Sequence, residues 1–321
     1  MVGMVSKGLV TKLPNKPAFV ISVDTELVWG FIQHPKRSVP ALFQNNPERA
    51  RSAINTLLQL FENYDIKATW AVVGHLFLTP GEEKDLVSSD IPQLAEGWVP
   101  RDFYQSLNYT SLFYCRDIVE RIISNPVKHE IGLHGFFHIP FDQCSRDVAR
   151  AELELGMKAA NKLGINPKSY VFPHNEVGHI DVLKENSIQI YRGEDIRRWW
   201  DRDRNFIIRT FDSVVHEIIA SPTSPSYHHG IWETPSSTGL YDPKLPFTIV
   251  PRVKLGINRA IRKNKVFHVW LHPWNLLLSE NLEEDLRKIF EFVACKRDEG
   301  KLDVMTMGEL STHLNGQVRV E

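Results

Sequence analysis

The chain has 321 residues, and its 38 lysines and arginines nearly balance its 39 aspartates and glutamates, for a formal charge of −1. Hydrophobic residues make up 42% of the chain, which excludes an intrinsically disordered protein and predicts a folded, soluble one. The lack of a basic excess argues against a protein that binds nucleic acid through charge.

Cysteine usage and the N-terminal residues both point to a reducing compartment. The three cysteines, Cys115, Cys144 and Cys295, are far apart and predict neither a disulfide framework nor a Cys-x-x-Cys metal site. The first residues lack the apolar core of a signal peptide, and no stretch approaches the roughly 18 apolar residues that a membrane span needs. We therefore expect a cytoplasmic protein without a membrane span.

Short β-branched runs alternate along the chain with segments of helical periodicity. The predicted strands cover residues 18–24, 67–74, 129–135, 169–173, 187–193, 266–272 and 302–307. The predicted helices cover residues 50–61, 147–163 and 282–297. This alternation predicts parallel strands wrapped by helices. An α/β barrel is favoured over an open sheet, because polar residues follow the C-terminal ends of several strands.

Two segments depart from the alternation. Residues 79–115 lack a clear period and predict a long insertion after the second strand, placed to cap a site. Residues 209–250 are rich in Ser, Pro and Thr and predict hairpin or loop structure. No break in composition marks a second domain, so we expect one domain over 1–321 with its core at about 18–312.

Two carboxylates close the first predicted strand, at Asp24 and Glu26. Residues i and i+2 of an extended chain point the same way, so both side chains can face one cavity. The alternative is a pair of solvated loop acids or a helix cap.

Two histidines, His134 and His138, follow the predicted strand 129–135. A spacing of four puts both imidazoles on one face of a helical turn, which suits a metal ion. Two histidines and one carboxylate form a common ligand set for divalent metals. The alternative is two histidines with ordinary hydrogen-bond partners.

Two further strand ends carry polar residues. His272 closes a strand before Pro273, and its pKa suits a general acid, although it could instead cap a helix. Pro173, His174 and Asn175 predict a rigid loop lining the cavity. There His174 or Asn175 could orient a carboxylate or hold substrate, and the His174 N–H could bind an oxyanion.

Taken in order, these motifs resemble the polysaccharide deacetylases of the NodB-homology type, similar to carbohydrate esterase family 4. The resemblance extends from about Phe19 to Leu310. It rests on AFVISVDTE, KATWAVVG, HEIGLHGFFH, FPHN, WLHPWN and MTMGEL. It implies a distorted (β/α)7 barrel that removes N-acetyl groups from sugars with the help of a divalent metal.

Carried over to this chain, the resemblance implies His134 and His138 as metal ligands and His272 as general acid. Many members have adjacent aspartates where this chain has Asp24 followed by Thr25, so we expect Glu26 as third ligand and Asp24 as general base, with these two roles open to exchange. The expected ion is Zn²⁺, with Co²⁺, Ni²⁺, Fe²⁺ or Mn²⁺ as alternatives.

One departure from the family concerns the residue that orients the base. Val171 occupies the position of the family's arginine. His174, Arg192 or Arg198 is then expected to take over that role.

Aromatic residues near the motifs are candidates for stacking on a sugar ring. Trp29 and Trp274 are favoured, whereas core packing is the alternative for each. Further expected substrate contacts are Pro173, Asn175 and Asn275. Trp199, Trp200 and Trp232 are more distant candidates.

A cytoplasmic location indicates a nucleotide-linked or lipid-linked N-acetylated sugar, as a precursor of O-antigen or capsule. Two alternatives stay open. One is hydrolysis of another non-peptide C–N bond, as in the metal-independent, allantoinase-like branch of the superfamily. The other is a barrel that binds glycans without turnover.

Overall fold

A sheet of eleven strands forms the centre of the part of the protein that the structure describes. The computed structural model describes residues 10–11, 14–32, 47–86, 98, 110–194, 220–241 and 249–316. The strands are β1 (Val10–Thr11), β2 (Ala18–Thr25), β3 (Thr69–Val72), β4 (Glu130–Leu133), β5 (Ser169–Val171), β6 (Ile190–Gly193), β7 (Ser226–His228), β8 (Ile231–Pro235), β9 (Thr238–Gly239), β10 (Val266–Leu271) and β11 (Asp303–Met305).

The sheet is mainly parallel. Its strand order is β1-β7-β8-β6-β5-β4-β3-β2-β10-β9, and β11 pairs with β2. All neighbours from β8 to β9 are parallel, whereas β7 pairs antiparallel with both β8 and β1. Strand β2 is buried along its whole length, as expected for a parallel strand covered on both faces. The predicted α/β class and barrel-like curvature are confirmed, with the hairpin of 209–250 present as β7–β8.

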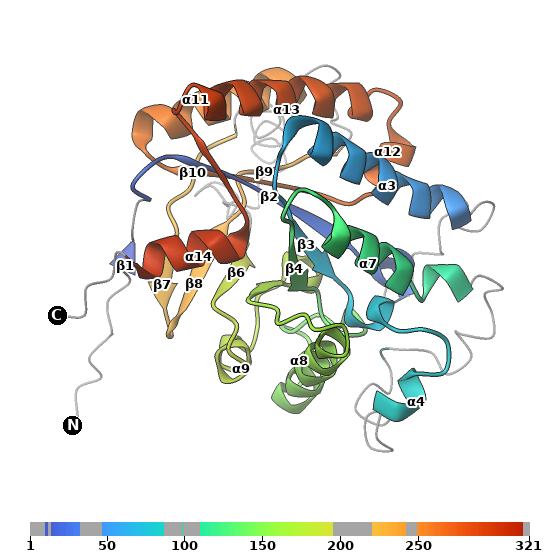
Figure 1. Ribbon diagram of the computed structural model, residues 1–321. Helices are drawn as coiled ribbons and strands as arrows, with labels where there is room; N and C mark the ends of the chain where they lie inside the picture. Colours follow the sequence, from blue (N-terminus) through green and yellow to red (C-terminus); the bar gives the residue numbers. More distant parts are fainter. Residues whose placement is uncertain are drawn as a thin grey trace, which may run out of the picture.

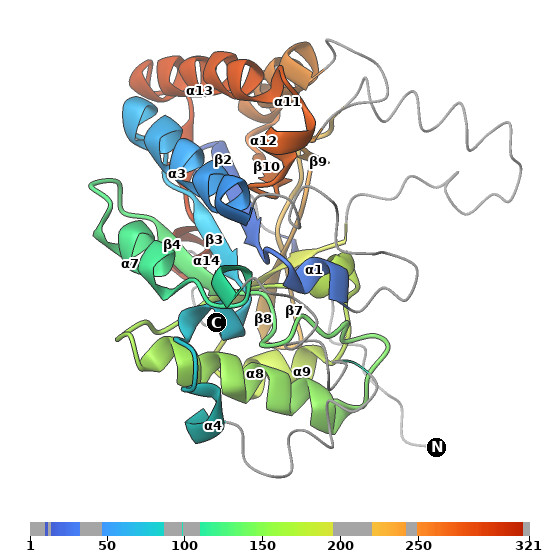
Figure 2. The same cartoon turned by 90° about the vertical axis from the view of Figure 1, so that its right-hand side faces the viewer.

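Helices pack against this curled sheet from opposite sides of the molecule (Figure 1, Figure 2). They are α1 (Trp29–Ile32), α3 (Pro47–Tyr64), α4 (Glu83–Leu86), α7 (Arg116–Ser124), α8 (Arg146–Asn161), α9 (Ile180–Glu185), α11 (Ile249–Lys263), α12 (Asn275–Leu278), α13 (Leu282–Asp298) and α14 (Met307–Asn315), with 3-10 turns η1 (Gly74–Phe77), η2 (Thr110–Leu112) and η3 (Pro173–Asn175). Helices α3, α11 and α13 lie together on one side, and α8 and α9 lie on the opposite side (Figure 1, Figure 2). No helix within the described ranges is long and apolar enough to cross a membrane.

The two ends of the barrel differ because β2 has two neighbours on one edge. Strand β11 pairs with Ala18–Val20 at the start of β2, and β3 pairs only from Ser22 onward. The amino-terminal end is therefore splayed around β11. At the other end, β2, β3 and β4 run side by side to their last residues, which brings the polar residues that follow them close together.

The predicted insertion at 79–115 is described only in part. The described residues of this range are 79–86, which include α4, then Trp98, and 110–115, which include η2. Arg198, Trp199 and Trp200 also lie outside the described residues.

Candidate active site and metal centre

A cavity of about 570 Å³ lies at the carboxyl ends of β2, β4, β5 and β10. Most of the polar residues predicted for a site line it: Asp24, Glu26, His134, His138, His174, Asn175 and His272. The four predicted strand ends therefore meet at one place, as in a βα barrel.

Glu26, His134 and His138 form a compact triad at the bottom of the cavity. The Oε2 atom of Glu26 lies 2.9 Å from His138 Nε2 and 3.5 Å from His134 Nε2, and the two Nε2 atoms are 3.2 Å apart. All three residues are buried. Among the described residues, they are the one group of at least three His, Cys, Asp or Glu whose ligand atoms lie close enough together to hold a metal ion. Gly30 of α1 makes room for the Glu26 carboxylate, because a Cβ there would overlap it.

The triad fits a divalent metal ion. His134 Nδ1 lies 2.8 Å from the Val171 carbonyl, so it carries the proton and leaves the Nε2 lone pair facing the triad. A carbonyl bonded to the second ring nitrogen is the usual arrangement for a metal-binding histidine. Two imidazole nitrogens and one carboxylate oxygen directed at one point are a ligand set that Zn²⁺ and related ions accept.

The backbone brings the two histidines together in a conformation that differs from the predicted one. Residues 134–140 form no helical turn. Gly135 has φ 74° and His138 has φ 65°, so the chain doubles back and returns the second imidazole to the first. The expectation of one helical face was wrong, because glycine lets the chain leave the strand in a left-handed turn.

Asp24 is held by Arg192 of β6. Its Oδ1 accepts a hydrogen bond from one guanidinium nitrogen at 2.7 Å and its Oδ2 accepts from the other at 2.7 Å. Asn175 Oδ1 and Ser22 Oγ accept further hydrogen bonds from the same guanidinium. Both side chains of the ion pair are almost fully buried, so this is a bidentate charge-assisted contact.

Arg192, rather than His174, is therefore the residue that orients Asp24. The His174 ring lies against His138, with ring centroids 5.0 Å apart. The sequence left Arg192 as one of three options because an arginine inside an apolar strand does not show which strand end its side chain reaches.

The two carboxylates stay ionised for different reasons. Burial raises the pKa of Asp24, but the charge and hydrogen bonds of Arg192 outweigh that effect and lower it. Burial also opposes ionisation of Glu26, but the charges of His272 and His138 outweigh that effect and hold its pKa well below the ordinary value.

His272 stands opposite the triad, at the end of β10. Its Nε2 lies 3.2 Å from Glu26 Oε1 and 4.0 Å from Asp24 Oδ2. Burial lowers the pKa of His272, but the nearby charges of Glu26 and Asp24 raise it above the ordinary value. Trp274 stacks on its ring, with centroids 4.5 Å apart and an interplanar angle of 26°.

Three predicted substrate contacts do not line the described cavity. Trp29 is fully buried and packs on Phe113 and other core rings, because α1 turns it away from the cavity. Pro173 is the first residue of η3 and is buried. Asn275 is 5% exposed, and its Oδ1 accepts a hydrogen bond from the His272 N–H at 2.8 Å. All three residues are therefore buried outside the described lining of the cavity.

Trp274 does line the cavity, together with residues that the sequence did not single out. These are Gly30, Phe31, Trp98, Pro140, Gln143, Glu176 and Trp270. The lining thus combines aromatic side chains with hydrogen-bonding groups. Trp98 could have been found, since it is a lone tryptophan within the predicted insertion.

The sequence profile of a family described as polysaccharide deacetylase matches residues 32–189. The match spans His134 and His138 but not Asp24, Glu26 or His272, so the roles of these three rest on geometry. No curated protein gives a significant match to the chain.

Solved structures match almost the whole chain. One is described as a polysaccharide deacetylase of Pseudomonas aeruginosa PAO1, with TM-score 0.60, 11% identity, and 95% of this chain and 92% of that chain covered. Another, from Mycobacterium smegmatis, has TM-score 0.51, 15% identity, and 97% and 96% covered. An allantoinase matches with TM-score 0.57, 11% identity, and 94% and 91% covered. At these identities the likeness concerns the fold, a distorted (β/α) barrel.

Proposed function

The chain belongs to the polysaccharide deacetylase family, and from that premise we propose that its cavity is a metal-dependent site for removing the N-acetyl group of an amino sugar. Membership makes the protein a hydrolase of amide C–N bonds, a carbohydrate deacetylase. One observation carries the finer proposal. A triad of Glu26, His134 and His138 lies beside an Asp24 that Arg192 holds and a His272 that faces them.

In this proposal Glu26, His134 and His138 hold the metal, with Zn²⁺ as the expected ion and Co²⁺, Ni²⁺, Fe²⁺ or Mn²⁺ as alternatives. A divalent ion bound there would lower the pKa of a water molecule and polarise the acetyl carbonyl. Glu26 is the better candidate for the third ligand, since both oxygens of Asp24 are engaged by Arg192.

Asp24 acts as general base. The two hydrogen bonds from Arg192 fix the direction of the Asp24 carboxylate and keep it ionised, so Asp24 can accept a proton from the attacking water. Arg192 takes the place of the arginine that the family carries where this chain has Val171. The guanidinium comes from β6 rather than β5, and Asn175 of η3 holds it from the other side.

His272 acts as general acid. Its raised pKa favours the protonated form, and its side chain, 18% exposed, reaches the cavity. It donates a proton to the amide nitrogen as the C–N bond breaks, because an unprotonated amine leaves poorly. The His174 N–H stays a candidate donor to the oxyanion.

The lining of the cavity supports a sugar as the substrate. Trp98, Trp270 and Trp274 contribute aromatic side chains to the lining, while Gln143 and Glu176 offer hydrogen-bonding groups. The described lining contains no lysine or arginine. A nucleotide-linked or lipid-linked precursor of O-antigen or capsule, as expected in the cytoplasm, would insert its sugar and keep its phosphates outside this part of the cavity.

The geometry favours this reaction over the two alternatives. Metal-independent C–N hydrolysis does not require two imidazoles facing one carboxylate. A barrel that only binds glycans does not require a carboxylate held by a buried arginine.

The test combines metal analysis with an assay of acetate release from N-acetylated sugars. We expect one divalent ion per chain, and we expect His134→Ala to lose both the ion and acetate release. His229→Ala, a substitution of an exposed histidine that does not line this cavity, is the control. Unchanged metal content and acetate release in His134→Ala would reject the proposal.

A further inference from the structure

A buried carboxylate lies behind the metal triad, outside the cavity. Glu152 belongs to α8 and is 2% exposed. No lysine, arginine or histidine pairs with it among the described residues. Burying a carboxylate without a cation is costly in free energy, so hydrogen bonds must offset the loss of hydration.

Those contacts come from one short segment of backbone. Phe136 N–H donates to Glu152 Oε2 at 2.9 Å, and Phe137 N–H donates to both carboxylate oxygens at 3.0 Å. Ile139 N–H donates to Oε2 at 3.3 Å. Three N–H groups of residues 136–139 thus converge on one carboxyl group, in the arrangement of the anion-binding nests of other proteins.

The segment needs such an anchor because its conformation is strained. His138 has a positive φ of 65°, a left-handed conformation that L residues other than glycine rarely adopt. Gly135, with φ 74°, passes so close to the carboxylate that a Cβ would lie 2.9 Å from Glu152 Oε2. The backbone is therefore shaped around the Glu152 side chain.

The two triad histidines differ in how their rings are held. His134 Nδ1 is bonded to the Val171 carbonyl, which fixes that ring directly. His138 Nδ1 is buried and has no hydrogen-bond partner among the described residues. The position of the His138 ring therefore depends on its backbone, and Glu152 binds the N–H groups on either side, of Phe137 and Ile139.

We propose that Glu152 is a positioning residue of the metal centre: its carboxylate holds the backbone of residues 136–139 so that His138 Nε2 faces His134 and Glu26. This inference rests on the proposed metal site and assigns to α8 a role that the cavity lining does not reveal.

The test compares Glu152→Gln with Glu154→Gln, an exposed substitution on the same helix. Glutamine keeps the size of the side chain but presents an NH₂ group to backbone donors, so at least one hydrogen bond is lost. Zn²⁺ affinity is measured by competition with a chromophoric chelator, and Co²⁺ coordination by its visible absorption. We expect Glu152→Gln to bind Zn²⁺ about 10- to 100-fold more weakly, with an altered Co²⁺ spectrum, and Glu154→Gln to match the wild type.

Wild-type affinity and spectrum in a folded Glu152→Gln protein would overturn the inference. If circular dichroism shows that this variant does not fold, Glu152→Asp is measured instead. Its carboxylate is one methylene shorter, so we expect a several-fold loss of affinity, and wild-type affinity would again overturn the inference.

His134→Ala in the same assay separates the two proposals. Loss of metal in His134→Ala with full binding in Glu152→Gln would refute the positioning role alone. Retained metal in His134→Ala would refute the metal site itself.

Discussion

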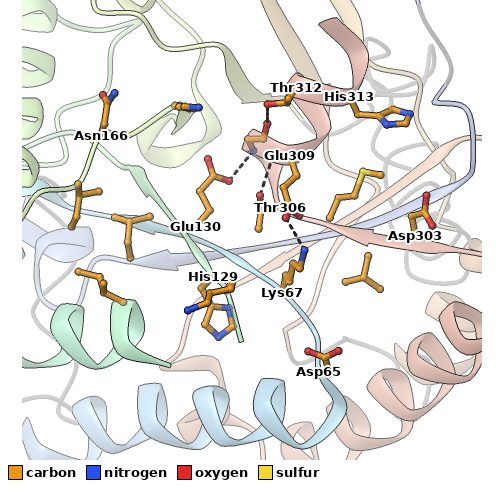
Figure 3. Close-up of a pocket in the computed structure, with 18 of the residues that line it drawn as sticks. Asp65, Lys67, His129, Glu130, Asn166, Asp303, Thr306, Glu309, Thr312 and His313 are labelled. Carbon is orange, nitrogen blue, oxygen red and sulfur yellow. Dashed lines mark hydrogen bonds and ion pairs between the residues drawn. The ribbon is translucent and has the colours of Figure 1, made fainter. Parts of the chain in front are cut away.

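The two ends of the barrel each hold a cavity, and the two cavities differ in how their charged side chains are bound. The carboxyl end holds the cavity of about 570 Å³, and the amino end holds a larger one of about 950 Å³ beside β4, β11 and α14 (Figure 3). The larger cavity is rich in charged side chains, and some of these bind one another. Lys67 pairs with Glu309 at 2.7 Å, and Glu309 completes the capping box of Thr306 at the start of α14.

Glu130 shows the same pattern at the amino end. Its Oε2 accepts hydrogen bonds from Thr69 Oγ1 and Gly308 N–H, both at 2.8 Å, so it joins β3 and β4 to α14. At the carboxyl end, by contrast, the carboxylate of Glu26 faces three imidazoles, and two of them, those of His134 and His138, would hold a metal ion together with it. The convergence of two imidazoles and a carboxylate on one point, and not volume, distinguishes the site from the other end of the barrel among the described residues.

Removal of the metal ligand should have the largest effect. We expect Glu26→Gln, or treatment with a chelator, to lower kcat by roughly 10³-fold, since water activation and carbonyl polarisation are worth several kcal/mol. Acetate release at saturating substrate measures this. Glu130→Gln, the matched change at the other end, should leave kcat unchanged; an equal loss in both variants would erase the distinction between the ends.

Arg192→Lys should lower kcat by roughly 10- to 100-fold, because lysine keeps the charge but loses the two-pronged contact with Asp24. Arg192 holds the pKa of Asp24 down, so a weaker contact lets that pKa rise. The acid limb of the kcat/KM profile should then move to higher pH. A lower kcat with an unmoved acid limb would contradict the assignment of Asp24 as base.

Acid should destabilise the amino end through His129. Burial lowers the pKa of His129 to about 4, so below pH 6.5 the unfolded chain takes up the proton first. Stability is lost as pH falls from 6.5 to 4, by about 2 kcal/mol after allowance for partial exposure. We measure the free energy of unfolding in urea at several pH values. Between pH 6.5 and 4 we expect it to depend less on pH in His129→Asn than in the wild type. An unchanged slope would show that His129 does not titrate in this way.

The smallest expected effect belongs to Trp274, one of the aromatic residues that line the cavity. Trp274 stacks on His272 and lines the cavity. Trp274→Phe should raise KM by about 3- to 10-fold, at roughly 1 kcal/mol for the loss of indole contact area with the sugar. Steady-state kinetics check this, and Trp232→Phe, which changes a core residue bonded to Asn315, is the control. A matching KM change in the control would remove Trp274 from the substrate contacts.

Sequence reasoning predicted the strand ends well and the side-chain directions less well. The parallel order of strands forces their carboxyl ends together, so Asp24, Glu26, His134 and His272 could be expected at one place. The turn at Gly135 and His138 could not, because its geometry depends on Glu152, which lies on a different element.

Two other residues show why adjacency in sequence is a weak guide. Trp29 is three residues from Glu26, yet α1 rotates it into the core. Arg192 is far from Asp24 in sequence, yet the order β6-β5-β4-β3-β2 curls enough for its side chain to reach across the barrel.

Anomalous diffraction from crystals of the zinc-loaded protein tests the central claim most directly. We predict one strong peak within coordination distance of Nε2 of His134, Nε2 of His138 and a carboxylate oxygen of Glu26, with Asp24 still paired to Arg192. A peak coordinated by Asp24 in place of Glu26, or one located at the larger cavity alone, would contradict this description of the site.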